Sequence, residues 1–336
     1  MRRKVTIQSI ADFTGLSKFA VSRALSGKPG VSSQTRDMIF KAAGQLGYFK
    51  DSKSAQAKAP GEMIDLDARK WSGTILVLFP NIRFQNPESL YWGPLFNGIS
   101  TRLNQRGINV LTLTEPKDDA VFSLLNPEAI MGVITIGSIS TPILAEIRSL
   151  GIPVMMVDHF DPSFQCDSIF TDNLSCMKEM MNLVINKGYR DYQFLGNIRD
   201  AHSFYERFLA FRAALEDNDI ELKQNPSLNG PDIENFRETF TAVITEHGLP
   251  EVFVCANDIY ALFAIETMEI MGMPIPDTLV FTGFDNTHPS IPFLATVNVN
   301  KELLGKRAVD QMLWRILNPD TSYEKILIQA DIIIRD

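Results

Sequence analysis

Residues 6–27, TIQSIADFTGLSKFAVSRALSG, contain two short helical patterns on either side of a tight break. The first pattern places apolar residues at the spacing of one helix face, at Ile7, Ile10 and Ala11. Gly15 can adopt the positive φ of a sharp turn, and Ser17 can cap the second helix through its hydroxyl. The stretch therefore predicts a helix-turn-helix, an element that can place its second helix in the major groove of DNA.

The second helix is expected to bury one face and to expose another. Its inner face consists of Ala20, Val21, Ala24 and Leu25, which leaves Lys18, Phe19, Ser22 and Arg23 pointing outward. Arg23 can pair with two acceptors of a guanine, Lys18 can reach guanine or phosphate, and Phe19 can cover a thymine methyl group. The alternatives are solvated surface charges and a core aromatic, but the helical period does not place Phe19 on the buried face.

A third helix after Ser32 completes a head that is strongly basic. Its apolar stripe is Thr35, Met38, Ile39, Ala42, Ala43 and Leu46. Residues 1–58 hold 11 Lys and Arg against 3 Asp and Glu, a net charge of +8, whereas the rest of the chain holds 21 against 37, a net charge of −16. A basic head on an acidic body indicates that only the head meets a polyanion.

From Thr74 onward strand and helix patterns alternate, which is typical of βαβ units around parallel sheets. Short apolar runs predict buried strands within residues 74–79, 109–114, 132–137, 153–158, 193–196, 251–258 and 279–286. Amphipathic segments predict helices near residues 92–106, 142–150, 173–187, 204–217, 233–247 and 258–272. A last strand pattern, ILIQADIIIRD, closes the chain. The expected fold class is α/β, with two doubly wound parallel-sheet subdomains behind the three-helix head.

Several of the expected strands end in polar residues: Asp158, Asn257-Asp258 and Asp285-Asn286. Ligands of open α/β sheets bind beyond the carboxyl ends of the strands. The surrounding aromatic residues are Trp92, Phe160, Phe204, Tyr205 and Phe284. Carboxylates, amides and aromatic faces together suit a small molecule with hydroxyls, such as a sugar. The plainer alternatives are that Asp258 caps the following helix and that Phe284 belongs to the core.

Other classes of protein fit the sequence poorly. No apolar window is long enough to span a membrane, and polar residues interrupt any signal peptide at the basic start. Three widely spaced cysteines fit a reducing compartment, so we expect a cytoplasmic protein. The four histidines are scattered and no catalytic or phosphate-binding motif follows a strand, so we expect no enzyme, no cofactor and no metal site. His159 beside Asp158 is interpreted as the rim of a pocket.

The head resembles the DNA-binding domain of the lactose-repressor (LacI/GalR) family of bacterial transcription regulators. The residues that carry the resemblance are Val5-Thr6-Ile7, Ile10-Ala11, Thr14 through Ser17, Val21 through Leu25, Val31-Ser32, Thr35-Arg36 and Leu46 through Tyr48. By that resemblance Lys18 and Phe19 select the operator sequence and Arg23 contacts bases. Phosphate contacts are implied for Thr6, Ser17, Ser22, Ser32 and Thr35.

The joint after Tyr48 departs from the family's pattern. Lys50 and Asp51 stand where the family has a Pro-Asn pair, and Ala57 aligns with the leucine that wedges into the minor groove. Residues 59–72 are interpreted as a linker behind a degenerate hinge. We therefore expect DNA binding that is weaker, or less coupled to a ligand, than is usual in the family.

The body resembles the family's periplasmic-binding-protein-like core. Its signposts include Gly151 through Val154, Val157-Asp158, Asp172-Asn173, Ser203 through Arg207, Ala256 through Asp258 and Gly283 through Asp285. The resemblance and the aromatic pattern give the candidate effector residues Trp92, Asp158, Phe160, Ser203, Arg207, Asn257 and Asp285. Val299-Asn300 replaces the family's Gln-Pro at a crossover between subdomains. The expected domains are residues 1–58, a linker at 59–72, and a core at 73–336, with one subdomain at 73–162 and 300–322 and the other at 163–299 and 323–336.

These features predict a transcription regulator, a homodimer that binds a pseudo-palindromic double-stranded operator. A small-molecule effector, expected to be a sugar or sugar derivative, would bind between the core subdomains and change operator affinity. Two alternatives stay open: an architectural DNA-binding protein whose core senses nothing, and a doubly wound enzyme with an appended DNA-binding head. No membrane partner is expected.

Overall fold

The computed structural model describes residues 6–25, 31–32, 35–36, 38–39, 42–43, 71–80, 88–115, 129–230 and 233–335. The chain divides into two units, a head at residues 1–65 and a body at residues 66–336. Each unit has a hydrophobic core of its own. Of the predicted hinge and linker, Ala57 and residues 59–70 lie outside the described residues, whereas Trp71 is buried in the core of the body.

The head begins with the predicted helix-turn-helix. Helix α1 spans Ile7–Thr14 and helix α2 spans Lys18–Leu25. Between them Gly15 has the left-handed φ of 70° that the sequence anticipated for the turn. The Ser17 hydroxyl accepts from the Ala20 amide at 3.2 Å, which confirms the predicted cap of α2.

A small apolar core holds the head together. It consists of Ile10, Ala11, Val21, Ala24, Ile39, Ala42 and Ala43. Met38 is 46% exposed, so its place in the predicted buried stripe was wrong. The buried residues of that third helix follow the i, i+3, i+4 spacing from Ile39, and Met38 lies about 100° away around the helix. Leu46 is outside the described residues.

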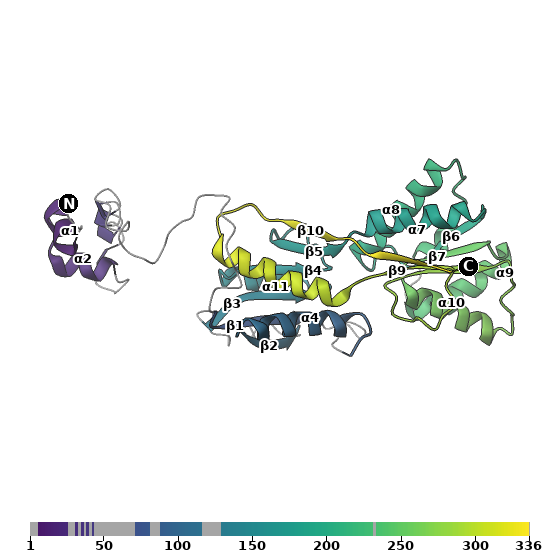
Figure 1. Cartoon of the computed structure of the whole chain (residues 1–336), viewed down its shortest axis with the longest axis horizontal. Coiled ribbons are helices and arrows are strands. Elements are labelled where there is room, and N and C mark those ends of the chain that lie inside the picture. Colours follow the sequence, from purple (N-terminus) through teal and green to yellow (C-terminus); the bar gives the residue numbers. More distant parts are fainter. Residues whose placement is uncertain are drawn as a thin grey trace. The chain divides into compact units, whose positions relative to one another are not determined.

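The body contains two sheets (Figure 1), as the doubly wound prediction requires. The first has the strand order β10-β5-β4-β3-β1-β2 and is parallel throughout. Its strands are β1 (Thr74–Phe79), β2 (Asn109–Thr114), β3 (Ile130–Ile136), β4 (Val154–Val157), β5 (Asp167–Thr171) and β10 (Lys325–Ile328). The second has the order β11-β9-β8-β7-β6, with β11 antiparallel at its edge. Its strands are β6 (Tyr192–Leu195), β7 (Val252–Cys255), β8 (Val280–Phe284), β9 (Ala295–Asn298) and β11 (Asp331–Ile334).

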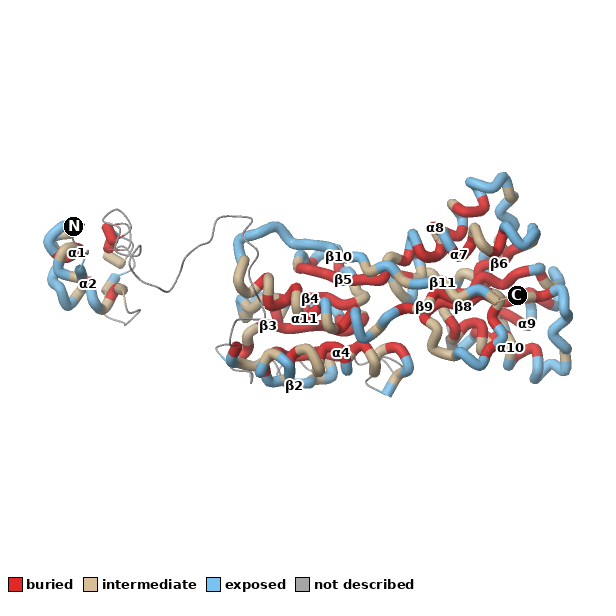
Figure 2. The backbone as a smooth tube through the Cα atoms, viewed as in Figure 1, coloured by how far each residue is buried: buried red, intermediate tan, exposed pale blue. Residues whose placement is uncertain are grey.

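Helices cover both sheets, and the central strands are buried (Figure 2). Against the first sheet lie α4 (Trp92–Gln105), α6 (Thr141–Ser149) and α11 (Lys301–Leu317). Around the second lie α7 (Asn173–Asn186), α8 (His202–Asp217), α9 (Phe236–His247) and α10 (Asp258–Ile270), with short 3-10 turns at Pro226–Asn229 and Ile233–Asn235. Helix α11 packs directly on α4, because Gly98 and Gly305 let the two backbones approach. The sequence had not predicted α11.

The first sheet and its helices form the first subdomain, and the second sheet with α7 to α10 forms the second subdomain. The chain crosses between them after Thr171, after Asn298 and after Ile328. The sequence-based boundaries put residues 163–171 and 323–328 in the second subdomain, whereas the structure pairs β5 with β4 and β10 in the first sheet. The single strand expected at the end of the chain is two strands, one in each sheet.

None of the helices among the described residues is both long and apolar enough to cross a membrane.

Candidate DNA-binding face and ligand site

The outer face of α2 carries the side chains predicted to read bases. Lys18, Phe19 and Ser22 are exposed, with Phe19 at 69%, while Val21 and Ala24 face the core. The guanidinium carbon of Arg23 lies 5.3 Å from the centroid of the Phe19 ring, one helical turn away. This contact holds a cation and an exposed aromatic ring together on the face that would meet DNA.

Three of the hydroxyl residues assigned to phosphates begin helices. The Thr6 and Ser17 hydroxyls accept from the amides of Ser9 and Ala20, and the Ser32 hydroxyl accepts from the Thr35 amide at 3.1 Å. Helix N-termini bear a partial positive charge and favour anions. These residues therefore act as caps, and they mark the helix ends that would approach a phosphate backbone.

In the body, Arg207 is the centre of a buried hydrogen-bond network. It is 1% exposed, and each of its three nitrogens donates a hydrogen bond. Nε donates to Asn173 at 2.9 Å, Nη1 to the Ala256 carbonyl at 2.7 Å, and Nη2 to Asp285 at 3.2 Å. Its guanidinium also stacks on Phe284, 3.6 Å from the ring centroid. Phe284 is thus both a core residue and the platform that orients Arg207.

Asp158 approaches this network from the first subdomain. It follows β4 in the left-handed region, with φ of 54°, and its carboxylate accepts from the Tyr91 hydroxyl at 3.2 Å. Burial raises the pKa of Asp158 to about 7, although the Arg207 guanidinium acts in the opposite direction; the Asp285 carboxylate adds to the rise. Tyr91, Asp158, Arg207 and Asp285 are called the junction cluster below.

Asp285 also has a left-handed backbone, with φ of 92°, directly after β8. Two acidic residues in this sparsely populated region at the ends of strands from both sheets are the kind of backbone strain that gathers at functional sites. The Asp285 carboxylate also acts on the pKa of Asp158, so the structure brings together two strand ends that the sequence could only place separately.

Contacts beside the junction cluster also join the two subdomains. Lys325 of β10 forms an ion pair with Glu206 of α8 at 3.1 Å. Glu206 in turn accepts from Asn173, the residue that holds Arg207. The pKa of Glu206 falls to about 2 because hydrogen bonds from His202, Asn173 and Lys325 outweigh the cost of burial. Asn173 therefore connects Arg207 to the Glu206–Lys325 ion pair, which joins the two subdomains.

The remaining predicted ligand residues take different places. Trp92 is half-buried with its ring against Tyr91, at 4.7 Å between centroids. Phe160 is 47% exposed and lies 5.5 Å from the His202 ring of the second subdomain. Ser203 is buried in the first turn of α8. Asn257 directly follows Ala256, whose carbonyl accepts from Arg207.

The expected helix cap at Asp258 is corrected by the structure. Asn257 caps α10, because its side-chain oxygen accepts from the Ile259 and Tyr260 amides. Asp258 is fully buried and instead accepts from Thr287, His288 and Thr296. Its carboxylate thus fixes the segment after Asp285 and Asn286.

Sequence reasoning missed two residues of this region, Tyr91 and Lys301. Tyr91 precedes α4 and is buried, with its hydroxyl on Asp158. Lys301 begins α11 and donates to the backbone carbonyl of Asp285. The only signal for Lys301 was its place immediately after Val299-Asn300, the pair noted as unusual.

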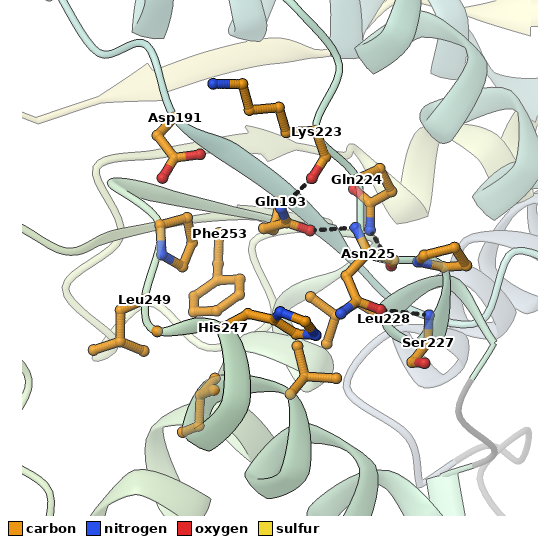
Figure 3. Close-up of a pocket in the computed structure, with 15 residues that line it drawn as sticks. Asp191, Gln193, Lys223, Gln224, Asn225, Ser227, Leu228, His247, Leu249 and Phe253 are labelled. Atoms are coloured by element: carbon orange, nitrogen blue, oxygen red, sulfur yellow. Dashed lines mark hydrogen bonds between the residues drawn. The ribbon is translucent and has the colours of Figure 1, made fainter.

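A separate pocket of about 590 Å³ lies in the second subdomain near the starts of β6 and β7 (Figure 3). Its walls include Gln193, Asn225, His247 and Phe253. Gln193 accepts from the Asn225 amide at 2.8 Å, which fixes one wall. None of the predicted ligand residues lines this pocket. A second pocket, of about 430 Å³, includes Phe160 in its lining.

Comparison with known proteins defines the class to which both units belong. Residues 6–51 match the family of bacterial regulatory proteins, lacI family. Residues 182–336 match the periplasmic binding protein-like domain. The chain is thus a DNA-binding regulator of transcription with a lacI-family DNA-binding domain on a periplasmic binding protein-like core.

Relatives of known name cover nearly the whole chain. The probable HTH-type transcriptional repressor ExuR of Bacillus subtilis (strain 168) is 24% identical over 99% of this chain and 98% of its own length. The HTH-type transcriptional repressor PurR of Haemophilus influenzae is 23% identical, covering 98% of this chain and 97% of its own length.

Solved structures share the fold. A complex of the transcriptional regulator CelR with cellobiose superimposes with a TM-score of 0.66, at 19% identity, over 98% of this chain and 99% of its own. The lac repressor dimer bound to operator and the anti-inducer ONPF gives a TM-score of 0.64 at 18% identity, over 98% of both chains.

Proposed function

We propose that the chain controls transcription as a homodimer that binds a pseudo-palindromic operator in the cytoplasm and responds to a carbohydrate effector. Two copies of α2 would enter successive major grooves, where Arg23 and Lys18 would read bases. The effector would bind at the junction cluster. The lac repressor dimer on its operator and the complex of CelR with cellobiose support this proposal by analogy.

The observation that carries the proposal is the composition of the junction cluster. Tyr91 and Asp158 belong to the first subdomain, and Arg207 and Asp285 to the second. A ligand that bonds to both pairs would favour one relative arrangement of the subdomains. The difference in ligand-binding free energy between the two arrangements is the energy with which a regulator can change the DNA affinity of its head.

The rival classes lack a comparable observation. In an architectural protein whose core binds no ligand, two strand-end carboxylates in left-handed backbone would serve no function. An enzyme needs a nucleophile or base within reach of a reacting atom, and the named relatives are regulators. We therefore propose a regulator without catalytic activity and without a cofactor.

The first experiment is selection of bound sequences from randomised duplex DNA with the full chain, at two salt concentrations. Arg23→Ala tests the base-reading face, and Arg237→Ala, an exposed arginine of α9, is the matched control. We expect a palindromic consensus from the wild type and the control, and its loss in Arg23→Ala. Binding that has no sequence preference and falls only with salt would contradict the proposal and favour the architectural class.

A further inference from the structure

An exposed aromatic ring lies on the base-reading face of α2. Phe19 is 69% exposed, and the apolar core described for the head does not include it. Two basic residues of the same helix flank it, Lys18 directly before it and Arg23 one turn after it. A large apolar ring among cations, on a helix that docks in a major groove, gains free energy when DNA covers it. Phe19 therefore serves recognition rather than the stability of the head.

The Phe19 ring and the Arg23 guanidinium form one recognition unit. The guanidinium carbon lies 5.3 Å from the ring centroid, because residues four positions apart share a helix face and the side chains lean toward the start of the helix. One base-pair step measures about 3.4 Å along the axis of DNA, and two steps measure about 7 Å. A separation of 5.3 Å that includes a sideways component therefore fits contacts with neighbouring base pairs.

The two side chains recognise different chemical groups of the bases. A guanidinium donates to the O6 and N7 atoms of guanine, and an aromatic ring covers the methyl group at C5 of thymine. Cytosine has a hydrogen at that carbon, so the ring buries less apolar surface against it. 5-Methylcytosine carries the same methyl group at the same carbon as thymine. A ring that contacts only this methyl group therefore accepts both thymine and 5-methylcytosine.

We propose that cytosine methylation controls operator binding, because Phe19 and Arg23 together read a pyrimidine methyl group on the base pair next to a guanine. A site with thymine at this position is a full operator whatever the methylation state of the DNA. A site with cytosine there becomes a full operator only when that cytosine is methylated. The inference rests on the proposed function, since it adds a second input, a modification of the DNA, to the same recognition helix.

The experiment selects bound sequences from three randomised duplex libraries with the full chain. The first library contains the four natural bases. The second contains uracil in place of thymine and so carries no pyrimidine methyl group, and the third also contains 5-methylcytosine in place of cytosine. We expect a thymine next to a guanine in each half-site of the first consensus. At that position the second library should show no pyrimidine preference, and the third should show 5-methylcytosine.

Anisotropy titrations on synthetic duplexes of the first consensus then measure the effect of the methyl group alone. Burial of one methyl group corresponds to about a fourfold change in affinity. Since a symmetric operator presents two half-sites, we expect replacement of both thymines by uracil to weaken binding about fifteenfold. Two 5-methylcytosine–guanine pairs at these positions should bind more tightly than two unmodified cytosine–guanine pairs by the same factor.

Substitutions then test whether Phe19 is responsible. We expect Phe19→Ala to bind the thymine and uracil duplexes equally, while its requirement for the neighbouring guanine remains, because Arg23 is unchanged. Phe13→Ala is the matched control, since Phe13 is another exposed phenylalanine of the head, at 58% exposure on α1. Its loss should leave the methyl effect intact. Circular dichroism would check that each variant is folded.

Three results would overturn the inference while leaving the regulator proposal intact. A palindromic consensus that accepts uracil as well as thymine would exclude reading of a methyl group. A required guanine that is not next to the methyl-bearing pyrimidine would exclude Phe19 and Arg23 as one unit. A methyl effect that survives in Phe19→Ala would exclude Phe19 as its cause. If none of the libraries yields a sequence preference, the proposed function and the inference fail together.

Discussion

Replacing Asp158 with Asn should make the body more stable at mildly alkaline pH. Asn keeps the size of Asp and an oxygen that can accept from Tyr91, and it tolerates a left-handed φ equally well. Only the charge is lost. Because burial raises the pKa of Asp158 from 3.8 to about 7, the folded protein retains a proton that the unfolded chain has already released between these two pH values.

The sign and size of the effect follow from this difference. In the wild type the free energy of unfolding falls as the pH rises from about 4 to about 7, and it stays at the lower level above that range. A rise of about three pKa units corresponds to about 4 kcal/mol. Since Asp158 is only partly shielded from water, we expect Asp158→Asn to be more stable than the wild type by about 2–4 kcal/mol near pH 8, and equal to it near pH 4.

Urea unfolding of both proteins at several pH values, followed by tryptophan fluorescence, measures this difference. Asp161→Asn is a control of opposite sign, because hydrogen bonds from Thr141 and Ser163 overcome the effect of burial and lower the pKa of Asp161. That substitution should destabilise the protein near neutral pH and lose its effect in acid. If Asp158→Asn were no more stable than the wild type near pH 8, the reasoning that burial of the Asp158 carboxylate costs more than Arg207 and Tyr91 return would be refuted.

Two further predictions concern packing in the body. Arg315→Met should lower the free energy of unfolding by about 3–5 kcal/mol in urea. The buried Asp167 would lose the two hydrogen bonds, at 2.7 and 2.8 Å, that its carboxylate accepts from Arg315. A loss below about 1 kcal/mol would show that the ion pair adds little to stability. Gly305→Ala should cost at least about 2 kcal/mol and lower the melting temperature, since an added methyl group would overlap the Leu95 backbone carbonyl of α4. Gly230→Ala is the control for the loss of a glycine itself, because an added Cβ there meets open space and the backbone is not left-handed.

The sequence predicted those elements whose side chains follow a regular apolar period. The runs at residues 74–79 and 109–114 coincide with β1 and β2, and the helix-turn-helix begins and turns where its cap and glycine indicated. Strand β5 was not predicted because its first residue, Asp167, is acidic. That residue is buried only because Arg315, far along the chain, reaches back to it. A partner so distant in sequence leaves no local signal.

In the candidate ligand site, too, the sequence predicted some residues and missed others. Asp158 and Asp285 were noticed because each follows a strand, and the structure brings both toward Arg207. Tyr91 precedes a helix in a segment without a motif, so nothing in the local sequence marks its hydroxyl as the donor to Asp158. Its role depends on the segment before α4 lying beside the end of β4, which only the three-dimensional arrangement defines.

Lys301 shows how a departure from a family pattern can be read from structure. The pair Val299-Asn300 stands where the family has Gln-Pro, and by sequence alone that difference only raised a question about the hinge. In the structure Asn300 caps α11 by accepting from Leu303, and the next residue sends its amine to the Asp285 and Val299 carbonyls. The crossover between the subdomains thus places a cation beside the backbone of Asp285 in the junction cluster. Because Lys301 belongs to the first subdomain and Asp285 to the second, a change in the relative arrangement of the two sheets would strain or break this hydrogen bond, which couples the crossover to the junction cluster.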